Sequence, residues 1–115
     1  MKELKNMFKL SHKVSIYVPS KQQDGTKVYG RLKKVNEVKA ELAEMFGGCT
    51  STRAVGSWIL QSGNMQSESV ELCTSYAEKI TPENIDTVIG IGERLKEEMN
   101  QEAISVELDG ELYFL

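Results

Sequence analysis

Apolar residues in the first half of the chain follow two different periods. Residues 12–18 alternate between apolar and polar, as in a half-buried strand, and Pro19 ends it because proline has no amide to donate. The two sides of this strand are Val14, Ile16 and Val18, and Lys13, Ser15 and Tyr17. From residue 28 to 46 the apolar residues, Leu32 among them, recur at helical spacing, and Gly47 and Gly48 end that helix.

A hairpin follows this helix. Residues 53–60 and 68–76 alternate, and Ser62-Gly63-Asn64 forms the turn between them. The alternation places Trp58 beside Ala54 and Gly56, and Glu68 beside Val70 and Leu72, on what we expect to be the helix-packed face. A glycine inside a strand, here Gly56, predicts a bulge or a close backbone approach. The residues expected to point away from the helices are Tyr17, Val55, Ile59 and Cys73.

The last third of the chain contains a second helix and a closing strand. Thr81-Pro82-Glu83 has the residues of a helix start, and the expected buried stripe includes Ile85 and Ile89. Gly90 and Gly92 weaken this helix, which favours a packing role for both. Residues 104–108 alternate, Asp109-Gly110 is a hairpin signal, and residues 111–115 return as a short strand tied into the fold.

The order strand, helix, strand, strand, helix, strand is that of a ferredoxin-like domain. The sequence therefore predicts an α+β βαββαβ sandwich, with two helices on one face of an antiparallel sheet and one extra short C-terminal strand. Residues 12–115 form this single domain, and residues 1–11 form an N-terminal arm or short helix.

Composition excludes several classes of function. The net charge of −3 argues against broad binding of nucleic acid, although basic residues gather in the first half of the chain. No apolar run is long enough to cross a bilayer, and the N-terminus lacks a signal peptide, so we expect a cytoplasmic protein without a membrane partner.

The residues for metal or nucleophile chemistry are few. Cys49 and Cys73 lack metal-ligand spacing and, with His12 as the single histidine, provide no zinc set; both are expected to be free thiols. A nucleophilic Cys49 would need an activating base, and nothing places His12 near it. We assign no catalytic residue, no metal and no cofactor, and the balance favours a protein that is not an enzyme.

The hairpin and the C-terminus together resemble a protein family. Gly47-Gly48-x-Thr50, Gly56-x-Trp58, Gly63, Glu68 and the closing run ISVELDGELYF are similar to a group of small uncharacterised proteins of bacteria, archaea, plasmids and phages. The resemblance covers about residues 12–115, and its motifs are specific as a set and weak singly. It implies a ferredoxin-like fold without an established activity. It also suggests a role in conflict between host and mobile element, such as binding a host defence protein or sequestering a small signalling molecule.

Glu68 and Trp58 are the most informative candidates for a ligand site. A carboxylate on the packed face needs a partner, so Glu68 anchors a ligand or acts as an acid or base, unless it reaches water or caps a backbone group at the strand end. Trp58 is a core residue or a stacking platform for a flat ligand.

A second group of candidates fits an anion. Arg53 with Thr50 and Ser51 offers a guanidinium, hydroxyls and the amides of the glycine turn, although this run lacks the spacing and lysine of a P-loop and loop termination also explains it. Tyr17 completes the set on the open face of the sheet. Because that face is partly apolar, we expect a homodimer or larger homo-oligomer, unless the arm or the terminal hairpin covers it.

These residues support three hypotheses. The first is a non-enzymatic binding protein that captures a small anionic or nucleotide-like ligand, or a host protein. The second is a small ferredoxin-like enzyme that uses Glu68 as general acid or base, with Tyr17 or His12 nearby. The third is an inhibitor that acts by protein–protein contact alone, with exposed aromatic residues such as Phe8, Tyr29 or Tyr113 as anchors.

Overall fold

The computed structural model describes residues 3–115 of the chain; Met1 and Lys2, the first residues of the predicted arm, lie outside them. The described elements, in chain order, are a 3₁₀ turn (Leu4–Asn6), β1 (His12–Pro19), α1 (Arg31–Phe46), β2 (Thr50–Ile59), β3 (Met65–Ala77), α2 (Pro82–Glu98), β4 (Ser105–Leu108) and β5 (Glu111–Phe114). This order is the one that the sequence pattern predicts.

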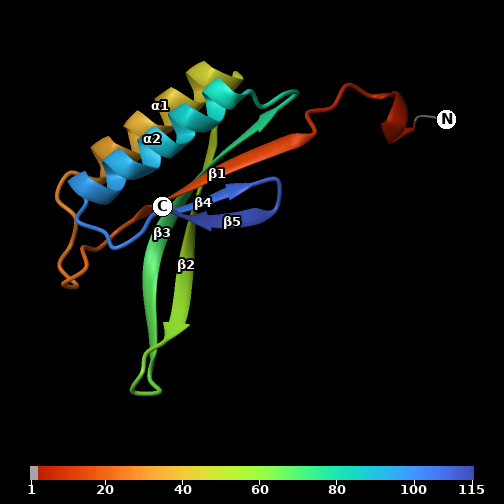
Figure 1. Ribbon diagram of the computed structural model, residues 1–115. Coiled ribbons are helices and arrows are strands. Elements are labelled where there is room, and N and C mark those ends of the chain that lie inside the picture. The colour runs from red at the N-terminus through yellow and green to blue at the C-terminus, as the bar shows by residue number, and fades with distance from the viewer. Residues whose placement is uncertain (1–2) are drawn as a thin grey trace.

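Within residues 3–115, the five strands form one antiparallel sheet in the order β2-β3-β1-β4-β5. The first strand of the chain therefore lies in the middle, between β3 and β4. Figure 1 shows α1 and α2 side by side on one face of this sheet. This is the ferredoxin-like arrangement with an extra C-terminal strand, so the predicted fold class is confirmed.

The core lies between the sheet and the helices. Ile16 and Val18 of β1 are fully buried, and they belong to one cluster with Val38 and Leu42 of α1 and Leu95 of α2. Full burial of an aliphatic side chain of this size contributes about 1.5–3 kcal/mol relative to exposure. In the alternating pattern of residues 12–18, the apolar residues therefore face the helices and the polar residues face the other side of the sheet.

The register of β3 reverses the predicted faces of the hairpin. Ile16 pairs with Cys73, and residues that oppose each other in antiparallel strands share one side of the sheet. Cys73 is therefore fully buried under the helices, while Val70 and Leu72 lie on the open face, which no described helix covers. The prediction that Val70 and Leu72 face the helices is wrong, and so is the prediction that Cys73 points away from them.

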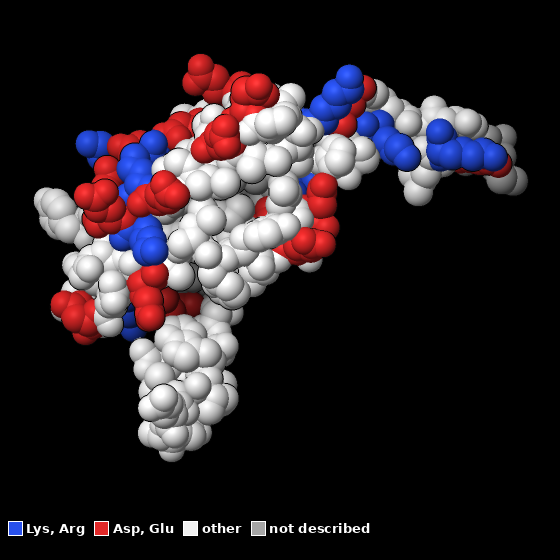
Figure 2. Space-filling model, in the orientation of Figure 1, with Lys and Arg blue, Asp and Glu red and all other residues white. Residues whose placement is uncertain are grey.

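The outer half of the β2–β3 hairpin projects beyond both helices (Figure 1). Val55 and Ile59 are on the helix side of the sheet by register, contrary to expectation, yet they are 68% and 66% exposed because no helix reaches them. Residues 54–67 contain no charged residue, and Figure 2 shows the projecting end of the molecule as uncharged. The hairpin thus presents an exposed, uncharged surface on both sides.

The first helix begins three residues later than predicted. Gly30 takes a left-handed conformation (φ 72°), so α1 starts at Arg31. The buried stripe of α1 is Val35, Val38 and Leu42. At about 100° per residue, Leu32 lies well away from the middle of that stripe, and its side chain is 74% exposed rather than buried.

The second helix confirms its predicted start. Thr81 Oγ1 accepts a hydrogen bond from the Asn84 amide (3.1 Å), and Asn84 Oδ1 accepts one from the Thr81 amide (3.0 Å). Gly92 is buried, and a Cβ there would collide with the side chain of Leu115, whereas a Cβ at Gly90 would meet nothing. The predicted packing role is therefore correct for Gly92 and wrong for Gly90. Neither α-helix of residues 3–115 combines the length and the apolar character needed to cross a membrane.

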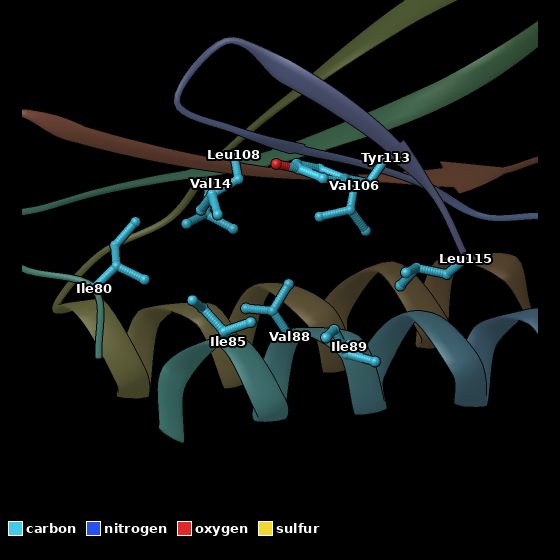
Figure 3. A pocket seen from close by; sticks show the side chains of 9 residues that line it. All are labelled: Val14, Ile80, Ile85, Val88, Ile89, Val106, Leu108, Tyr113 and Leu115. Atoms are coloured by element: carbon cyan, nitrogen blue, oxygen red, sulfur yellow. The ribbon is translucent and has the colours of Figure 1, made fainter. Parts of the chain in front are cut away.

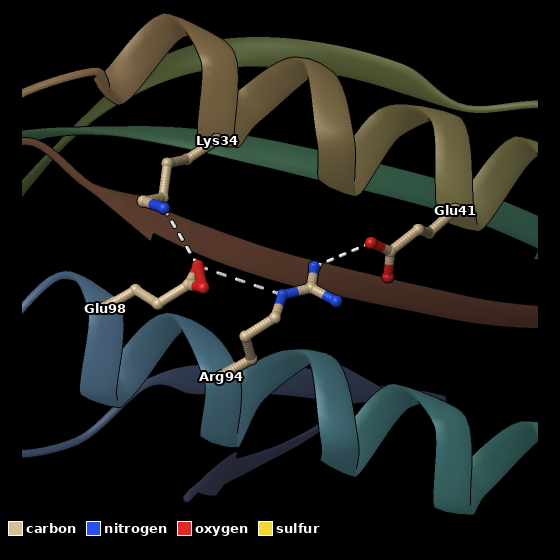
Figure 4. Close-up of polar contacts among 4 residues, drawn as sticks. All are labelled: Lys34, Glu41, Arg94 and Glu98. Atoms are coloured by element: carbon tan, nitrogen blue, oxygen red, sulfur yellow. Dashed lines mark hydrogen bonds and ion pairs between the residues drawn. The ribbon is translucent and has the colours of Figure 1, made fainter.

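Ion pairs join the two helices on their outer side (Figure 4). Arg94 Nη2 donates to Glu41 Oε1 at 2.7 Å, and Lys34 Nζ donates to Glu98 Oε1 at 2.9 Å. The bond from Lys34 lowers the pKa of the Glu98 carboxyl. The stability that this ion pair contributes is therefore fully present above the usual carboxylate pKa, and it is lost as the pH falls from there through the lowered pKa. Ion pairs that are this exposed contribute about 0–1 kcal/mol each, so they account for only a small part of the stability of the helix pair.

Candidate functional site

Glu68 is held at the point where β1 leaves the sheet. Its Oε2 accepts hydrogen bonds from the Lys21 amide (2.8 Å) and the Ser20 amide (3.2 Å), with the Ser20 hydroxyl at 3.5 Å. β1 ends at Pro19, opposite Val70, so these two amides have lost the strand partner that β3 would otherwise provide. The carboxylate replaces that partner, which agrees with the alternative that Glu68 caps backbone groups.

The loop after β1 is held in place by the hydrogen bonds to Glu68 and by bonds within the loop itself. Asp24 accepts bonds from the Thr26 amide (3.0 Å) and hydroxyl (2.6 Å), and Lys21 forms an isolated β-bridge with Lys27. On the other side, Gly56 pairs with Glu68 in regular register, without the predicted bulge, and a Cβ there would have no close neighbour. Glu68 therefore has a fixed loop beside it and no side chain opposite it on β2.

Two polar grooves, one on each face of the sheet, share Lys21 and Glu68 in their linings. The first, which we call the basic groove, has a volume of about 580 Å³. It is lined by Ser20, Lys21, Lys27, Val28, Arg31, Arg53, Val55, Ser67, Glu68 and Ser69. Four of these side chains are cations and one is a carboxylate. Arg53 Nε lies 3.7 Å from Glu71 Oε1, a long ion pair between an exposed guanidinium and a largely buried carboxylate.

The second groove, which we call the amide groove, has a volume of about 400 Å³. Its walls include Gln22, Gln23, Gln66, Gln101, Trp58, Phe114, Lys21 and Glu68. Trp58 is on the open face opposite Gln66 and is 43% exposed, and Phe114 of β5 is 70% exposed. Trp58 is therefore not a core residue. A groove with two aromatic rings, several amides and one carboxylate suits a flat, polar ligand.

A third hollow has the wrong chemistry for such a ligand. It lies between α2 and the β4–β5 hairpin and has a volume of about 260 Å³. Figure 3 shows the side chains of Ile85 and Val88 on α2 pointing toward those of Val14 and Val106 on the sheet, with Ile89 also in the lining. Ile85 and Ile89 were predicted to be buried, but at 38% and 36% exposure they form an open wall. We regard this apolar cleft as an extension of the core.

The structure brings only some of the predicted site residues together. Arg53 and Glu68 line the basic groove, and Trp58 and Glu68 line the amide groove. Thr50 lies at the other end of β2, roughly 27 Å from Trp58 at the usual rise of a strand. Thr50 lines a hollow beside the glycine turn, and Ser51 pairs with Cys73 on the helix side. Thr50 and Ser51 therefore cannot share one small ligand with Trp58.

Tyr17 lies on the open face, as expected, opposite Leu72 and outside both grooves. His12 Nδ1 is 2.8 Å from Asp109 Oδ2, and this hydrogen bond lowers the pKa of Asp109. His12 is paired with Ala77 at the start of β1, whereas Glu68 lies beyond the far end of that strand. Tyr17 and His12, which the enzyme hypothesis places near Glu68, therefore line neither of the two grooves.

The cysteines are free thiols, as predicted. Burial raises the pKa of Cys73 to about 12 and also raises the pKa of Cys49. Both thiols are therefore protonated at neutral pH, which is the opposite of an activated nucleophile. Among residues 3–115, no three His, Cys, Asp or Glu residues gather into a set that could hold a metal ion.

The grooves also contain residues that sequence reasoning did not select. Lys21, Lys27 and Arg31 in the basic groove, and Phe114 and Gln101 in the amide groove, were not candidates. The gathering of basic residues in the first half of the chain was a signal for the first three. No local signal points to Phe114 or Gln101, because they reach the groove from the C-terminal part of the chain.

Comparison with known proteins gives a fold and no family. No protein-family model matches the chain, and a search of curated proteins found no match. The chain is similar to the solved structure of a phage SAM lyase in complex with S-methyl-5′-thioadenosine, with a TM-score of 0.66, 15% identity, and coverage of 99% of this chain and 95% of that chain. It is also similar to a phage SAM lyase in the apo state, with a TM-score of 0.59, 17% identity, and coverage of 95% and 94%. At these identities the likeness shows that the chain has the fold of these phage proteins.

Proposed function

We propose that this chain is a cytoplasmic binding protein for a nucleoside of the S-adenosylmethionine type, and that the ligand occupies the amide groove beside Glu68. The observation that carries this proposal is the placement of the Glu68 carboxylate, fixed by two backbone amides, in a groove that also contains Trp58 and Phe114. The proposal makes the first sequence hypothesis more specific, since that hypothesis already included a nucleotide-like ligand.

The chemistry of the groove matches the parts of such a ligand. An adenine ring stacks on an aromatic side chain, and each stacked base typically contributes about 1–3 kcal/mol. Glutamine amides donate to and accept from the edge of the base and the ribose hydroxyls. S-adenosylmethionine also carries a permanent positive charge on its sulfonium sulfur, which a carboxylate attracts. The bound nucleoside of the structurally similar phage SAM lyase supports this ligand class.

The biological setting is part of the same proposal. The resemblance to proteins of plasmids and phages, and the fold shared with phage proteins, support a role in a mobile element. A protein that captures a methyl donor or a related nucleoside would deprive host defence enzymes that consume it. Binding of a host defence protein instead is the competing form of the first hypothesis.

We also propose that the chain forms a homo-oligomer through the open face and the projecting hairpin. The open face carries Leu112, Tyr76 and Trp58, all more than 40% exposed, and the hairpin adds Val55 and Met65. Neither the arm nor the β4–β5 hairpin covers these residues in the described chain. The hairpin has no charged residue between Arg53 and Glu68, so a second copy could approach it without like-charge repulsion.

Native mass spectrometry of the purified protein tests both parts together. We expect an oligomer that retains added S-methyl-5′-thioadenosine under gentle conditions and releases it after mild denaturation. A monomer that shows neither a bound mass nor a thermal shift with S-methyl-5′-thioadenosine or S-adenosylmethionine would reject both proposals. An oligomer without any nucleoside would retain the assembly and favour a protein partner, as in the third hypothesis.

Substitution of Trp58 tests the stacking platform. We expect Trp58→Ala to weaken binding of S-methyl-5′-thioadenosine by about 5- to 150-fold in isothermal titration calorimetry, which corresponds to the loss of one stacked base. Ile59→Ala is the matched control, because Ile59 is the next residue on β2, points to the other side of the sheet and is 66% exposed. Equal effects of the two substitutions would contradict a stacking role.

A lyase is the second candidate function, and the free oxygen of Glu68 favours it. Oε2 takes all three hydrogen bonds of this carboxylate within residues 3–115, so Oε1 is free to accept a proton.

Release of S-methyl-5′-thioadenosine from S-adenosylmethionine breaks the bond between the sulfonium sulfur and the γ-carbon, and sulfur keeps the electron pair. Either the carboxylate of the substrate closes a ring at the γ-carbon, or a base removes a β-proton and a double bond forms. Glu68 is needed as a base in the second route.

A further inference from the structure

We propose that the apolar cleft between α2 and the β4–β5 hairpin binds the N-terminal arm, residues 3–11, of a second copy of this chain, with Phe8 as the anchor of the arm. The proposed nucleoside plays no part in this inference. The contact lies on the helix side of the sheet, so it is distinct from the open face and the projecting hairpin.

The cleft has room for an aromatic side chain. Its volume is about 260 Å³, and a cavity of about 150 Å³ with apolar walls already binds a benzene ring. The Tyr113 hydroxyl is the only polar side-chain group among the nine residues that line the cleft. Ile85 and Ile89, on the α2 wall, are each more than a third exposed to water. An apolar segment that displaces this water is bound favourably.

The arm is an apolar segment that its own chain does not hold. All of residues 3–11 are exposed, and Phe8 is 83% exposed. Within residues 3–115, the hydrogen bonds and the ion pair of this segment join arm residues to one another. Figures 1 and 2 show the arm running away from the rest of the molecule. A projecting segment that keeps Leu4 and Phe8 in water is suited to an apolar site on another chain.

The arm leaves the sheet on the wrong side for its own cleft. β1 lies between β3 and β4. Leu10 lines a hollow with Phe46 and Tyr76 on the β3 side of β1, whereas the cleft lies on the β4 side. Residues 3–9 span up to roughly 23 Å when extended, so they reach well beyond the surface of their own chain. A second copy is therefore the occupant that this geometry favours.

Charge complementarity favours the same pairing. Residues 81–93 and 105–115, which form most of the walls of the cleft, contain six carboxylates and no lysine or arginine. Four of these carboxylates form no ion pair within residues 3–115: Glu83, Asp86, Glu93 and Glu111. Residues 2–11 contain three lysines and one glutamate. Figure 2 shows basic side chains along the arm, and acidic ones on α2 and on the β4–β5 hairpin with uncharged surface between them. The basic arm is therefore attracted to the acidic border of the cleft.

Disulfide cross-linking between two differently tagged, co-expressed chains tests the proposal. One chain carries Phe8→Cys and the other Ile89→Cys, both with Cys49→Ser, because Cys73 is fully buried. Mild oxidation should then give a cross-linked pair that carries both tags. Thr87→Cys in place of Ile89→Cys is the matched control, since Thr87 is exposed on the same helix and does not line the cleft, and it should give only the background yield. Equal yields from the two positions, or no mixed pair with Ile89→Cys, would overturn the proposal.

A single chain that carries both Phe8→Cys and Ile89→Cys identifies which copy supplies the arm. Oxidation should join such chains into covalent dimers or larger species on a non-reducing gel. A disulfide formed only within one chain would overturn the second copy as the occupant and assign the arm to its own cleft.

Sedimentation velocity measures what the contact contributes to self-association. We expect Phe8→Ser to weaken it about 10- to 150-fold, because burial of one such side chain contributes about 1.5–3 kcal/mol. Tyr29→Ser is the control, since Tyr29 is a fully exposed aromatic residue outside the arm and the cleft, and it should leave association unchanged. Unchanged association of Phe8→Ser would overturn the arm contact and leave the open face as the proposed route to assembly. Neither experiment reads out nucleoside binding, so failure of the proposed ligand leaves both results valid.

Discussion

Replacing Leu42 with alanine should lower the free energy of unfolding by about 2–5 kcal/mol. Leu42 is fully buried on α1 and belongs to the cluster that joins this helix to Ile16 and Val18 of β1. Its removal loses the transfer free energy of the side chain and leaves a cavity between helix and sheet. For a domain of this size the loss is a large fraction of the total stability, so the variant should unfold at much lower urea concentration.

Leu32→Ala is the control for this prediction. Leu32 is on the same helix, has the same side chain and is 74% exposed, so its truncation should change the free energy of unfolding by less than about 0.5 kcal/mol. Urea unfolding followed by circular dichroism measures both variants. If Leu32→Ala cost as much as Leu42→Ala, an unrecognised interface would cover the outer side of α1.

The sequence predicts the order of elements well because local signals mark them. Alternation of residues 12–18, the capping residues Thr81 and Pro82, and the turn at Asp109-Gly110 all act within a few residues, and the structure confirms each. Asp109 and Gly110 both have positive φ (52° and 87°), as the predicted turn requires. Such signals depend on no contact with distant parts of the chain.

The faces of the hairpin could not be predicted, since both sides of β3 are mixed. On its helix side, Ser75 is buried and satisfies its hydroxyl by donating to the Gly48 carbonyl (2.6 Å), while Val70 and Leu72 lie on the open side. A buried serine with a backbone partner has no signature in hydropathy, and apolar residues on an open face resemble core residues. The period of a strand fixes which residues share a face, and pairing with β1 decides which face it is.

The candidate site was predictable in its residue types but not in its geometry. Arg53, Trp58 and Glu68 were selected from the hairpin alone, and they line the two grooves. The rest of each groove comes from the loop after β1, which Glu68 holds from 47 residues further along the chain, and from Arg31 at a helix start. A contact across that sequence separation leaves no local pattern.

Glu68→Gln should weaken binding of S-adenosylmethionine about 5- to 30-fold and affect S-methyl-5′-thioadenosine much less. Two unit charges 4 Å apart interact by about 4 kcal/mol at an effective dielectric constant near 20, and solvent in the open groove reduces this to roughly 1–2 kcal/mol. The glutamine keeps the shape of the side chain but not its charge, so the loss should follow the charge of the ligand. Glu107→Gln is the control, because Glu107 is another carboxylate on the open face, paired with Lys13 at 3.4 Å and outside both grooves.

Glu68→Ala separates the charge of Glu68 from its role in holding the loop. Alanine removes the acceptor of the Ser20 and Lys21 amides, so the loop from Ser20 to Val28 should loosen and both nucleosides should bind more weakly. Limited proteolysis should then cut this loop faster in Glu68→Ala than in Glu68→Gln.

The same two variants decide the lyase alternative: chromatography of the reaction mixture reports released S-methyl-5′-thioadenosine. Turnover that persists at the wild-type rate in Glu68→Gln would exclude Glu68 as the base and leave ring closure by the substrate as the route.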